Sequence, residues 1–174
     1  VIAMRLGVET LADRMTRRMS TRLALDFTTQ AIAAVAHAHA NKIIHCDVKP
    51  ENFILFPGNR LRLSDFGFSK VALRTVKASG SGTLGYLAPE QALGRPMFQS
   101  DVFALGLVIY QMFSGQLPDY PYEWPMPGHA RIRSKLRRRT MTWLRKSLEF
   151  RHQDRFRNAV AMEKAFRDIR VKLQ

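Results

Sequence analysis

Apolar residues recur mainly at helical spacing along this 174-residue chain, which predicts a domain built mostly of α-helix. Across residues 23–38 an apolar residue returns every three or four positions. Ser20 or Thr21 can cap the N-terminus of this helix, which we expect to end near Asn41. The longest apolar-dominated run, residues 102–113, predicts a helix that is buried on all sides.

Shorter patterns account for the rest of the chain. Residues 53–56 and 60–63 flank the turn sequence Pro57-Gly58-Asn59 and predict a β-hairpin. For the buried helix we predict an N-cap at Ser100–Asp101 and an end at Ser114–Gly115. The other predicted elements are a strand at 1–6, a short helix at 11–18, irregular stretches at 65–90 and 117–128, and amphipathic helices at 132–150 and 158–172.

The composition is that of an ordinary globular domain, with 46% hydrophobic and 24% charged residues. The run at 102–113 is too short to cross a bilayer. Arg5, Glu9 and Asp13 interrupt the N-terminal region, so we expect no signal peptide. The single cysteine, Cys46, excludes an internal disulfide. Together these features predict a cytoplasmic protein without a membrane span.

The net charge of +14 is concentrated near the C-terminus. Residues 129–174 hold 15 Lys and Arg against 4 Asp and Glu. An acidic partner at the C-terminal helices would explain this excess, and so would a basic face that contacts only solvent. No interleaved aromatic residues or nucleic-acid motif accompany residues 131–139, so we do not expect nucleic acid as the partner.

The candidate chemistry begins in the loop His45–Asn52, which has the sequence HCDVKPEN. This loop holds a carboxylate (Asp47), an ammonium group (Lys49) and an amide (Asn52). Phosphoryl transfer uses a carboxylate to orient the attacking hydroxyl, a cation to offset the phosphoryl charge, and oxygen ligands to hold Mg²⁺. A second carboxylate, Asp65, follows the predicted hairpin, which should fold back and bring it beside Asn52.

Four sequence blocks, in order, resemble motifs of the eukaryotic-type serine/threonine protein kinase family. HCDVKPEN resembles the catalytic loop, and Asp65-Phe66-Gly67 resembles the magnesium-binding motif. Residues 82–90 (GTLGYLAPE) resemble the end of the activation segment, and residues 100–106 (SDVFALG) the start of the large buried helix. The resemblance implies a mainly α fold, that of the kinase C-terminal lobe with a small β-hairpin at the catalytic site. It also implies transfer of the γ-phosphate of ATP, with Mg²⁺, to Ser or Thr hydroxyls of a protein substrate.

The resemblance assigns catalytic roles to the matching residues. Asp47 corresponds to the catalytic base, and Lys49 to the lysine that contacts the transferred phosphate. Thr83 corresponds to the residue that bonds both of these side chains. Asn52 and Asp65 correspond to the two magnesium ligands.

Further matches concern the nucleotide pocket and the interior. Ile54 resembles the apolar floor of the adenine pocket, and Met4 the residue at the back of that pocket. His45 and Phe66 resemble members of a stacked spine, and Gly67 completes the magnesium motif.

Four residues resemble structural or regulatory positions. Glu90 resembles an acid that pairs with a late arginine, and Arg155 is our candidate because an unpaired buried carboxylate is costly. Asp101 resembles a carboxylate that braces the catalytic loop, although it can also be a simple N-cap. Cys46 stands where many kinases have an arginine that pairs with a phosphate on the activation segment. We therefore expect activity that does not depend on such phosphorylation. We also expect Cys46 to be a small buried residue rather than a redox sensor.

The resemblance also sets a predicted domain boundary. No glycine-rich phosphate loop and no ATP-binding lysine of the family pattern precede the catalytic loop. We therefore interpret 1–174 as a partial catalytic domain, with 1–8 as the last small-lobe strand and the hinge, 9–174 as the C-terminal lobe, and the N-terminal β lobe missing. By itself, such a fragment is expected to bind ATP weakly and to be inactive.

Three other functions stay open at this point. A pseudokinase or scaffold would bind protein partners without phosphotransfer. It would have no need of the four polar residues Asp47, Lys49, Asn52 and Asp65. A small-molecule phosphotransferase would share a catalytic Asp and Asn but not the block at 82–90. A basic nucleic-acid-binding module would need residues 131–139 to carry its affinity.

Overall fold

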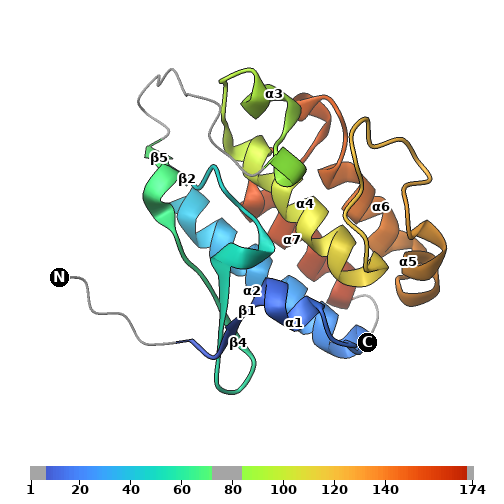
Figure 1. The fold of residues 1–174 in the computed structure, drawn as a ribbon. Coiled ribbons are helices and arrows are strands. Elements are labelled where there is room, and N and C mark those ends of the chain that lie inside the picture. Colours follow the sequence, from blue (N-terminus) through green and yellow to red (C-terminus); the bar gives the residue numbers. More distant parts are fainter. Residues whose placement is uncertain (1–6, 72–83, 172–174) are drawn as a thin grey trace.

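The apolar run of residues 102–113 forms the centre of the molecule. The computed structural model describes residues 7–71 and 84–171, and within these ranges helix α4 (Phe98–Ser114) is surrounded by the other long helices (Figure 1). All residues from 100 to 110 are buried. The hydrophobic core therefore lies around α4, as the sequence pattern predicts.

The other helices and the strands complete the fold. The remaining helices are α1 (Leu11–Met15), α2 (Thr21–Ala40), α3 (Pro89–Ala92), α5 (His129–Lys135), α6 (Arg138–Ser147) and α7 (Ala159–Val171), with single 3-10 turns η1 (Pro50–Asn52), η2 (Phe66–Phe68), η3 (Leu84–Tyr86) and η4 (His152–Asp154). The strands are β1 (Glu9–Thr10), β2 (Ile43–Ile44), β3 (Phe53–Phe56), β4 (Arg60–Leu63) and β5 (Lys70–Val71).

Helix α2 follows its predicted pattern from cap to end. Ser20 has an extended backbone, and its Oγ accepts a hydrogen bond of 3.2 Å from the Leu23 backbone N–H. The helix ends immediately before Asn41. Phe27 and Val35 are fully buried on the face that packs against α4 and α7. The predicted helix and its cap at Ser20 are confirmed.

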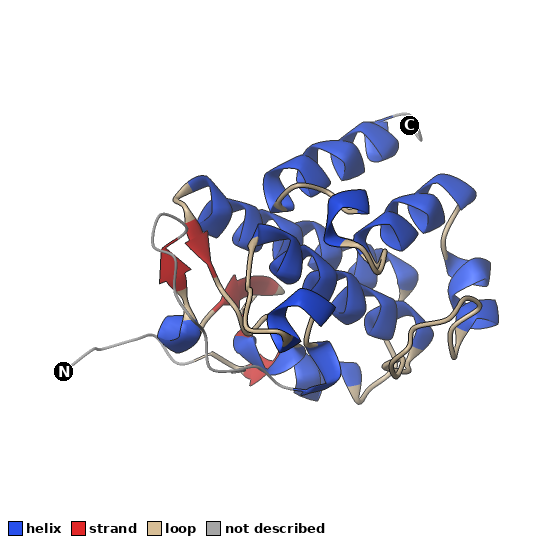
Figure 2. Cartoon of the chain, turned by 90° about the horizontal axis from the view of Figure 1, so that it is seen from above, coloured by secondary structure: helices blue, strands red, loops and turns tan. Residues whose placement is uncertain are grey.

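Two small antiparallel sheets lie along one edge of the helical body (Figure 2). The larger sheet has the order β1–β3–β4, with Phe53 opposite Leu63 in the hairpin, and the smaller one joins β2 to β5. Gly58 and Asn59 turn the hairpin with φ values of 79° and 56°, a region that these two residue types tolerate well. The predicted hairpin is therefore confirmed.

The prediction of one helix at 132–150 is wrong, because this segment forms two helices. Helices α5 and α6 are separated at Leu136 and Arg137, whose backbones are extended. Leu136 is only 7% exposed, so the chain turns its side chain into the core at this point. The free energy gained by burying the Leu136 side chain favours this break, although the sequence is otherwise suited to one continuous helix.

The predicted N-cap at Ser100–Asp101 is also wrong. Helix α4 begins at Phe98, and both polar residues lie in its first turn. The hydroxyl of Ser100 accepts a hydrogen bond from the Met97 backbone N–H at 3.1 Å and donates one to Glu90 at 2.7 Å. Both side chains thus bind partners outside helix α4. Ser100 binds Glu90, and Asp101 contacts the loop that carries the candidate chemistry.

The irregular stretches agree only in part with expectation. Within 65–90 the described residues form η2, β5, η3 and the start of α3, while residues 72–83 lie outside the described ranges. Residues 117–128 contain no helix or strand, as predicted. The strand predicted at 1–6 lies outside the described residues.

In the part of the chain that the structure describes, no helix combines the length and the apolar character needed to cross a membrane.

Candidate active site

One buried carboxylate fastens the candidate catalytic loop to the core helix. Asp101 is 1% exposed and accepts hydrogen bonds from the backbone N–H of His45 at 2.7 Å and of Cys46 at 2.9 Å. Its Oδ2 also lies 2.9 Å from Nε2 of His39. A buried charge requires such partners, and here they hold the start of the loop against the centre of the fold.

His39 completes this anchor, although the sequence analysis does not single it out. Its Nδ1 accepts a hydrogen bond of 2.9 Å from the Ala159 backbone N–H, so the ring proton is on Nε2 and is donated to Asp101. The ring therefore links α2, α4 and α7. No local signal could have found it, because its partners lie 62 and 120 residues away in the sequence.

The side chains of Lys49 and Asn52 meet at the carboxylate of Asp47. Oδ2 of Asp47 lies 2.9 Å from Nζ of Lys49 and accepts a hydrogen bond of 3.0 Å from Nδ2 of Asn52. The same amide nitrogen donates to the Asp47 backbone carbonyl at 2.7 Å. Asp47 and Asn52 are 5% and 6% exposed. The carboxylate is thus held in one orientation at the edge of the core.

The hairpin returns the second carboxylate to this place. Ser64 donates from its backbone N–H (2.8 Å) and its hydroxyl (3.0 Å) to the Asn52 carbonyl oxygen. Asp65 follows in the left-handed region, with φ of 60°, and its Oδ1 accepts a hydrogen bond of 3.3 Å from the Gly67 backbone N–H. The segment of Asp65 is therefore adjacent to Asn52, and its carboxylate is exposed.

The amide of Asn52 and the carboxylate of Asp65 suit a magnesium ion that also binds phosphate. Within the described residues Asn52 uses only its amide nitrogen, which leaves Oδ1 for a ligand. Asp65 likewise bonds Gly67 through only one of its two oxygens. Mg²⁺ prefers hard oxygen ligands and commonly takes one or two from the protein and the others from phosphates and water. The donor set therefore fits this ion.

An aromatic contact lies beside these polar groups. The ring centroids of His45 and Phe66 are 4.7 Å apart in an edge-to-face arrangement. His45 is fully buried, with Nε2 2.9 Å from the Ser64 carbonyl oxygen and Nδ1 accepting from the Asp47 backbone N–H at 3.3 Å. Phe66 is 44% exposed. The histidine ring therefore ties the loop to the end of the hairpin, and the outer face of the phenylalanine stays open.

A buried ion pair joins the start of α3 to the segment before α7. One guanidinium nitrogen of Arg155 lies 2.8 Å from Oε1 of Glu90. Arg155 also donates to the backbone carbonyls of Glu149, Phe150 and Gln99. Burial lowers the pKa of the Arg155 guanidinium, and the neighbouring Glu90 opposes this by raising it. Arg155 is thus the partner that was expected for Glu90.

Cys46 is buried next to Asp47. It is 3% exposed with φ of 68°, and its thiol lies 3.7 Å from the Ile44 carbonyl oxygen. The side-chain amide of Gln91, which the sequence analysis does not single out, donates to the Cys46 carbonyl at 2.6 Å. This environment agrees with the expectation of a small interior residue.

Of the two residues expected in the adenine pocket, Met4 and Ile54, the structure describes only Ile54. Met4 and Thr83 lie outside the described residues. Ile54 lies on β3 opposite Thr10 of β1. Gly7 packs directly on it, because a Cβ added at Gly7 would lie 2.1 Å from Cγ2 of Ile54. The segment that precedes α1 therefore passes over Ile54.

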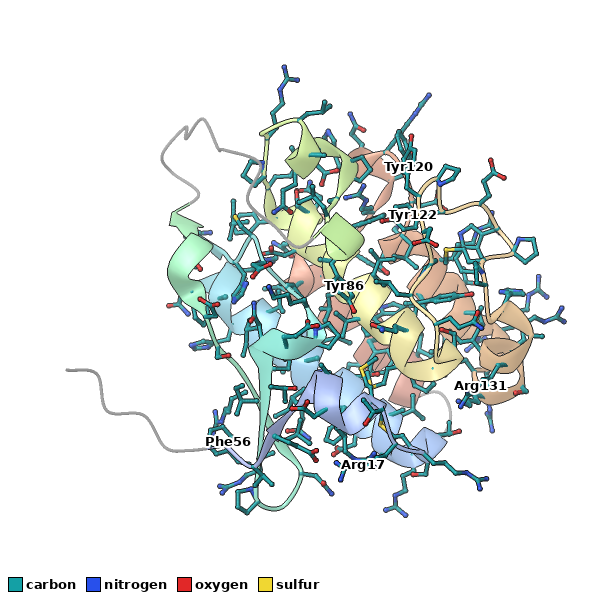
Figure 3. The ribbon with its side chains drawn as sticks, in the orientation of Figure 1. Arg17, Phe56, Tyr86, Tyr120, Tyr122 and Arg131 are labelled. Carbon is teal, nitrogen blue, oxygen red and sulfur yellow. The ribbon has the colours of Figure 1, made fainter. Side chains whose placement is uncertain are left out.

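Tyr86 is a further residue at the site that the sequence analysis does not name. It is 8% exposed, and its hydroxyl donates a hydrogen bond to Gln111 of α4. Figure 3 labels Tyr86 near α4. Burial raises the pKa of the Tyr86 hydroxyl, the charge of Glu51 raises it further, and the bond to Gln111 acts in the opposite direction. With Asp47 and Cys46, Tyr86 lines a small cavity beside the loop.

Comparisons with known proteins identify the family of the chain. Residues 3–167 match the protein kinase domain family. Serine/threonine-protein kinase PknA of Mycobacterium tuberculosis is 42% identical over 109 residues, which are 60% of this chain and 25% of that protein. PrkC of Bacillus subtilis is 36% identical over 99 residues (55% and 15%), and serine/threonine-protein kinase D2 of Rattus norvegicus is 37% identical over 106 residues (58% and 12%). The aligned segment thus spans a quarter or less of each of these relatives.

Proposed function

The chain belongs to the eukaryotic-type serine/threonine protein kinase family, and we propose from this that it carries the phosphoryl-transfer chemistry of such a kinase. In this proposal the γ-phosphate of ATP passes to the hydroxyl of a Ser or Thr residue in a protein substrate. The observation that carries the proposal is the convergence of Lys49 and Asn52 on the carboxylate of Asp47.

Asp47 is the proposed catalytic base. Lys49 and Asn52 hold its carboxylate in one orientation, so it can accept a hydrogen bond from the substrate hydroxyl, direct the hydroxyl oxygen at the γ-phosphorus and take up the proton. Positioning supplies much of the catalysis in phosphoryl transfer. The hydrogen bonds that the backbone N–H groups of His45 and Cys46 donate to Asp101 support this positioning.

Two further roles concern the phosphate groups. The ammonium group of Lys49, next to Asp47, is proposed to offset the charge of the phosphoryl group in transit. Oδ1 of Asn52 and the carboxylate of Asp65 would hold Mg²⁺, which neutralises phosphate charge when bound. The exposed position of Asp65 makes its carboxylate accessible to a ligand that enters from solvent.

The test is transfer of phosphate from Mg-ATP to a generic protein substrate by the full-length gene product that contains this chain. We expect Asp47→Asn and Asp65→Asn each to lower kcat about 100-fold or more. Asp168→Asn, at an exposed carboxylate on α7, is the matched control and should keep its activity. A folded full-length protein that binds ATP but transfers no phosphate would contradict the proposal and favour a scaffold.

A second measurement concerns the nucleotide. We propose that the 174 residues by themselves bind Mg-ATP weakly, because no glycine-rich phosphate loop precedes the catalytic loop in their sequence. Calorimetric titration would compare this chain with the full-length protein. Equal affinities would contradict this proposal and assign nucleotide binding to the residues described here.

A further inference from the structure

A groove between α1, the C-terminal end of α4 and α5 is lined by four cationic side chains, and no carboxylate is among the described residues that line it. We call it the basic groove, and its cations are Arg17, Arg18, Arg131 and Lys135. Figure 3 labels Arg17 near α1 and Arg131 on α5, on either side of the lower end of α4. The groove contains about 1070 Å³ of space, including the part open to solvent, which is large enough for a ligand.

Three of these cations have no ion-pair partner among the residues that the structure describes. Arg17 pairs with Glu9, and Lys135 donates a hydrogen bond of 2.7 Å to the Phe113 carbonyl near the end of α4. Arg18 and Arg131 form no ion pair with any residue that the structure describes. Cations are favourable near a helix C-terminus, which explains the position of Lys135. It does not explain Arg18, which lies on the α1 side of the groove.

The fold leaves room for Arg131 at this position. Gly115 ends α4 with φ of +79°, and a Cβ added there would lie 2.6 Å from a guanidinium nitrogen of Arg131. Burial lowers the pKa of the Lys135 ammonium, and the nearby charge of Arg131 lowers it further. The structure therefore holds two like charges close together over the end of a helix. An anion between them would relieve this repulsion.

The basic groove lies next to the candidate active site. Helix α1, which lines the groove with Ala12 and Met15, also packs against the catalytic-loop turn η1. Gln111 lines the groove as well and accepts the hydrogen bond from Tyr86. Tyr86 in turn lines the cavity beside Asp47. Gln111 and Tyr86 therefore connect the basic groove to the cavity beside Asp47.

We propose that the basic groove binds the carboxylate or phosphate of a side chain in the protein substrate, so that the enzyme selects Ser and Thr residues that have an acidic or phosphorylated residue nearby. This inference rests on the proposed function, which it deepens. The described residues that line the groove include no aromatic ring. Single-stranded nucleic acid is usually bound by cations together with aromatic rings that stack on its bases, so the lining favours a peptide.

The experiment measures peptide binding and phosphate transfer separately, on the full-length protein. The probes are fluorescein-labelled peptides with one acceptor serine and one variable residue (Glu, phosphoserine, Gln or Lys), which is moved through successive positions on both sides of the acceptor. At one or more of these positions we expect the Glu and phosphoserine peptides to bind about tenfold more tightly than the Gln peptide. The preference should weaken as salt is added, and kcat/KM for transfer should follow the same order.

Charge reversal tests the groove itself. Arg131→Glu and Arg18→Glu should each remove most of the preference for anionic peptides while leaving transfer to the Gln peptide unchanged. Arg133→Glu is the matched control, because Arg133 is exposed on the same helix α5 and does not line the groove. It should keep the preference. A preference for the phosphoserine peptide alone would support the proposal with phosphate as the anion. A preference for both the Glu and the phosphoserine peptides would support it with either a carboxylate or a phosphate as the anion.

Three results would overturn the proposal. One is a preference for the Lys peptide, or equal binding of all the peptides. Another is an anionic preference that survives both charge reversals. The third is tight binding of a single-stranded oligonucleotide that Arg131→Glu abolishes while the peptides show no preference. Failure of the proposed function looks different, because the anionic peptides would still bind through Arg131 while no peptide becomes phosphorylated.

Discussion

The two carboxylates that flank the candidate catalytic loop, Asp101 and Asp65, lie in opposite environments. Asp101 is 1% exposed and takes hydrogen bonds from two backbone N–H groups and from His39. Asp65 is exposed, has a left-handed backbone and bonds only the Gly67 N–H among the described residues. We infer that the buried side of the loop provides stability and that the open side is available for ligands.

The strongest test of this comparison is Asp101→Ala. The substitution leaves two backbone N–H groups and the His39 N–H buried without an acceptor, and each such group costs about 1–3 kcal/mol. We expect the free energy of unfolding to fall by about 3 kcal/mol or more, as measured by denaturant titration. Asp119→Ala, at an exposed carboxylate, is the control. An equally stable Asp101→Ala variant would contradict the anchoring role.

The next test is Glu90→Ala, farther along the buried side. Removal of one partner from a buried ion pair leaves an uncompensated charge and typically costs about 3–5 kcal/mol. We expect a loss near the lower end of this range, because Arg155 keeps its three backbone acceptors. Thermal unfolding followed by circular dichroism would measure it. Glu90→Gln should lose less than Glu90→Ala, because its amide oxygen can still accept the hydrogen bonds from Arg155 and Ser100.

A smaller effect is expected in alkaline solution at Tyr110. Burial raises the pKa of its hydroxyl to about 12, whereas a tyrosine in the unfolded chain ionises near pH 10. Between these values the unfolded state releases the proton first, so the stability contributed by this group is present below about pH 10 and is lost as the pH rises toward 12. Tyr110→Phe should therefore show a shallower loss of stability over this window. Tyr120→Phe, at an exposed ring, should not change the slope.

On the open side, Asp65→Asn should change stability by less than about 0.5 kcal/mol, as is usual for an exposed site. The same variant should lose phosphate transfer, as proposed above. Denaturant titration and the transfer assay on one preparation would separate the two effects. A destabilisation comparable to that of Asp101→Ala would show that the two carboxylates do not differ in role.

The smallest expected effect concerns phosphorylation. Cys46 cannot pair with a phosphate as an arginine would, and it is buried. Replacement of Thr75, Ser79 and Ser81, which lie outside the described residues, by Ala should leave turnover nearly unchanged. Steady-state kinetics of the triple variant would measure this. A large loss of turnover would show that another residue reads a phosphate in this segment.

Local patterns were sufficient for several parts of the molecule. The N-cap at Ser20, the apolar spacing of α2 and the turn at Gly58–Asn59 each depend on neighbours within a few residues, so the sequence predicts them directly. The loop that carries Asp47 and Asn52 is also local, because its hydrogen bond spans five residues. Here the backbone conformation and the side-chain contact follow from the same short segment.

Contacts between distant segments were decided only by the tertiary structure. His39 meets Asp101 and Ala159, Arg131 comes to lie in one groove with Arg18, and Leu136 breaks a predicted helix by turning into the core. None of these leaves a periodic or local signal, since each depends on which surfaces pack together when apolar side chains leave water. The sequence by itself therefore determined most of the elements and the residues of the candidate chemistry, while packing decided what anchors them and where the unpaired charges gather.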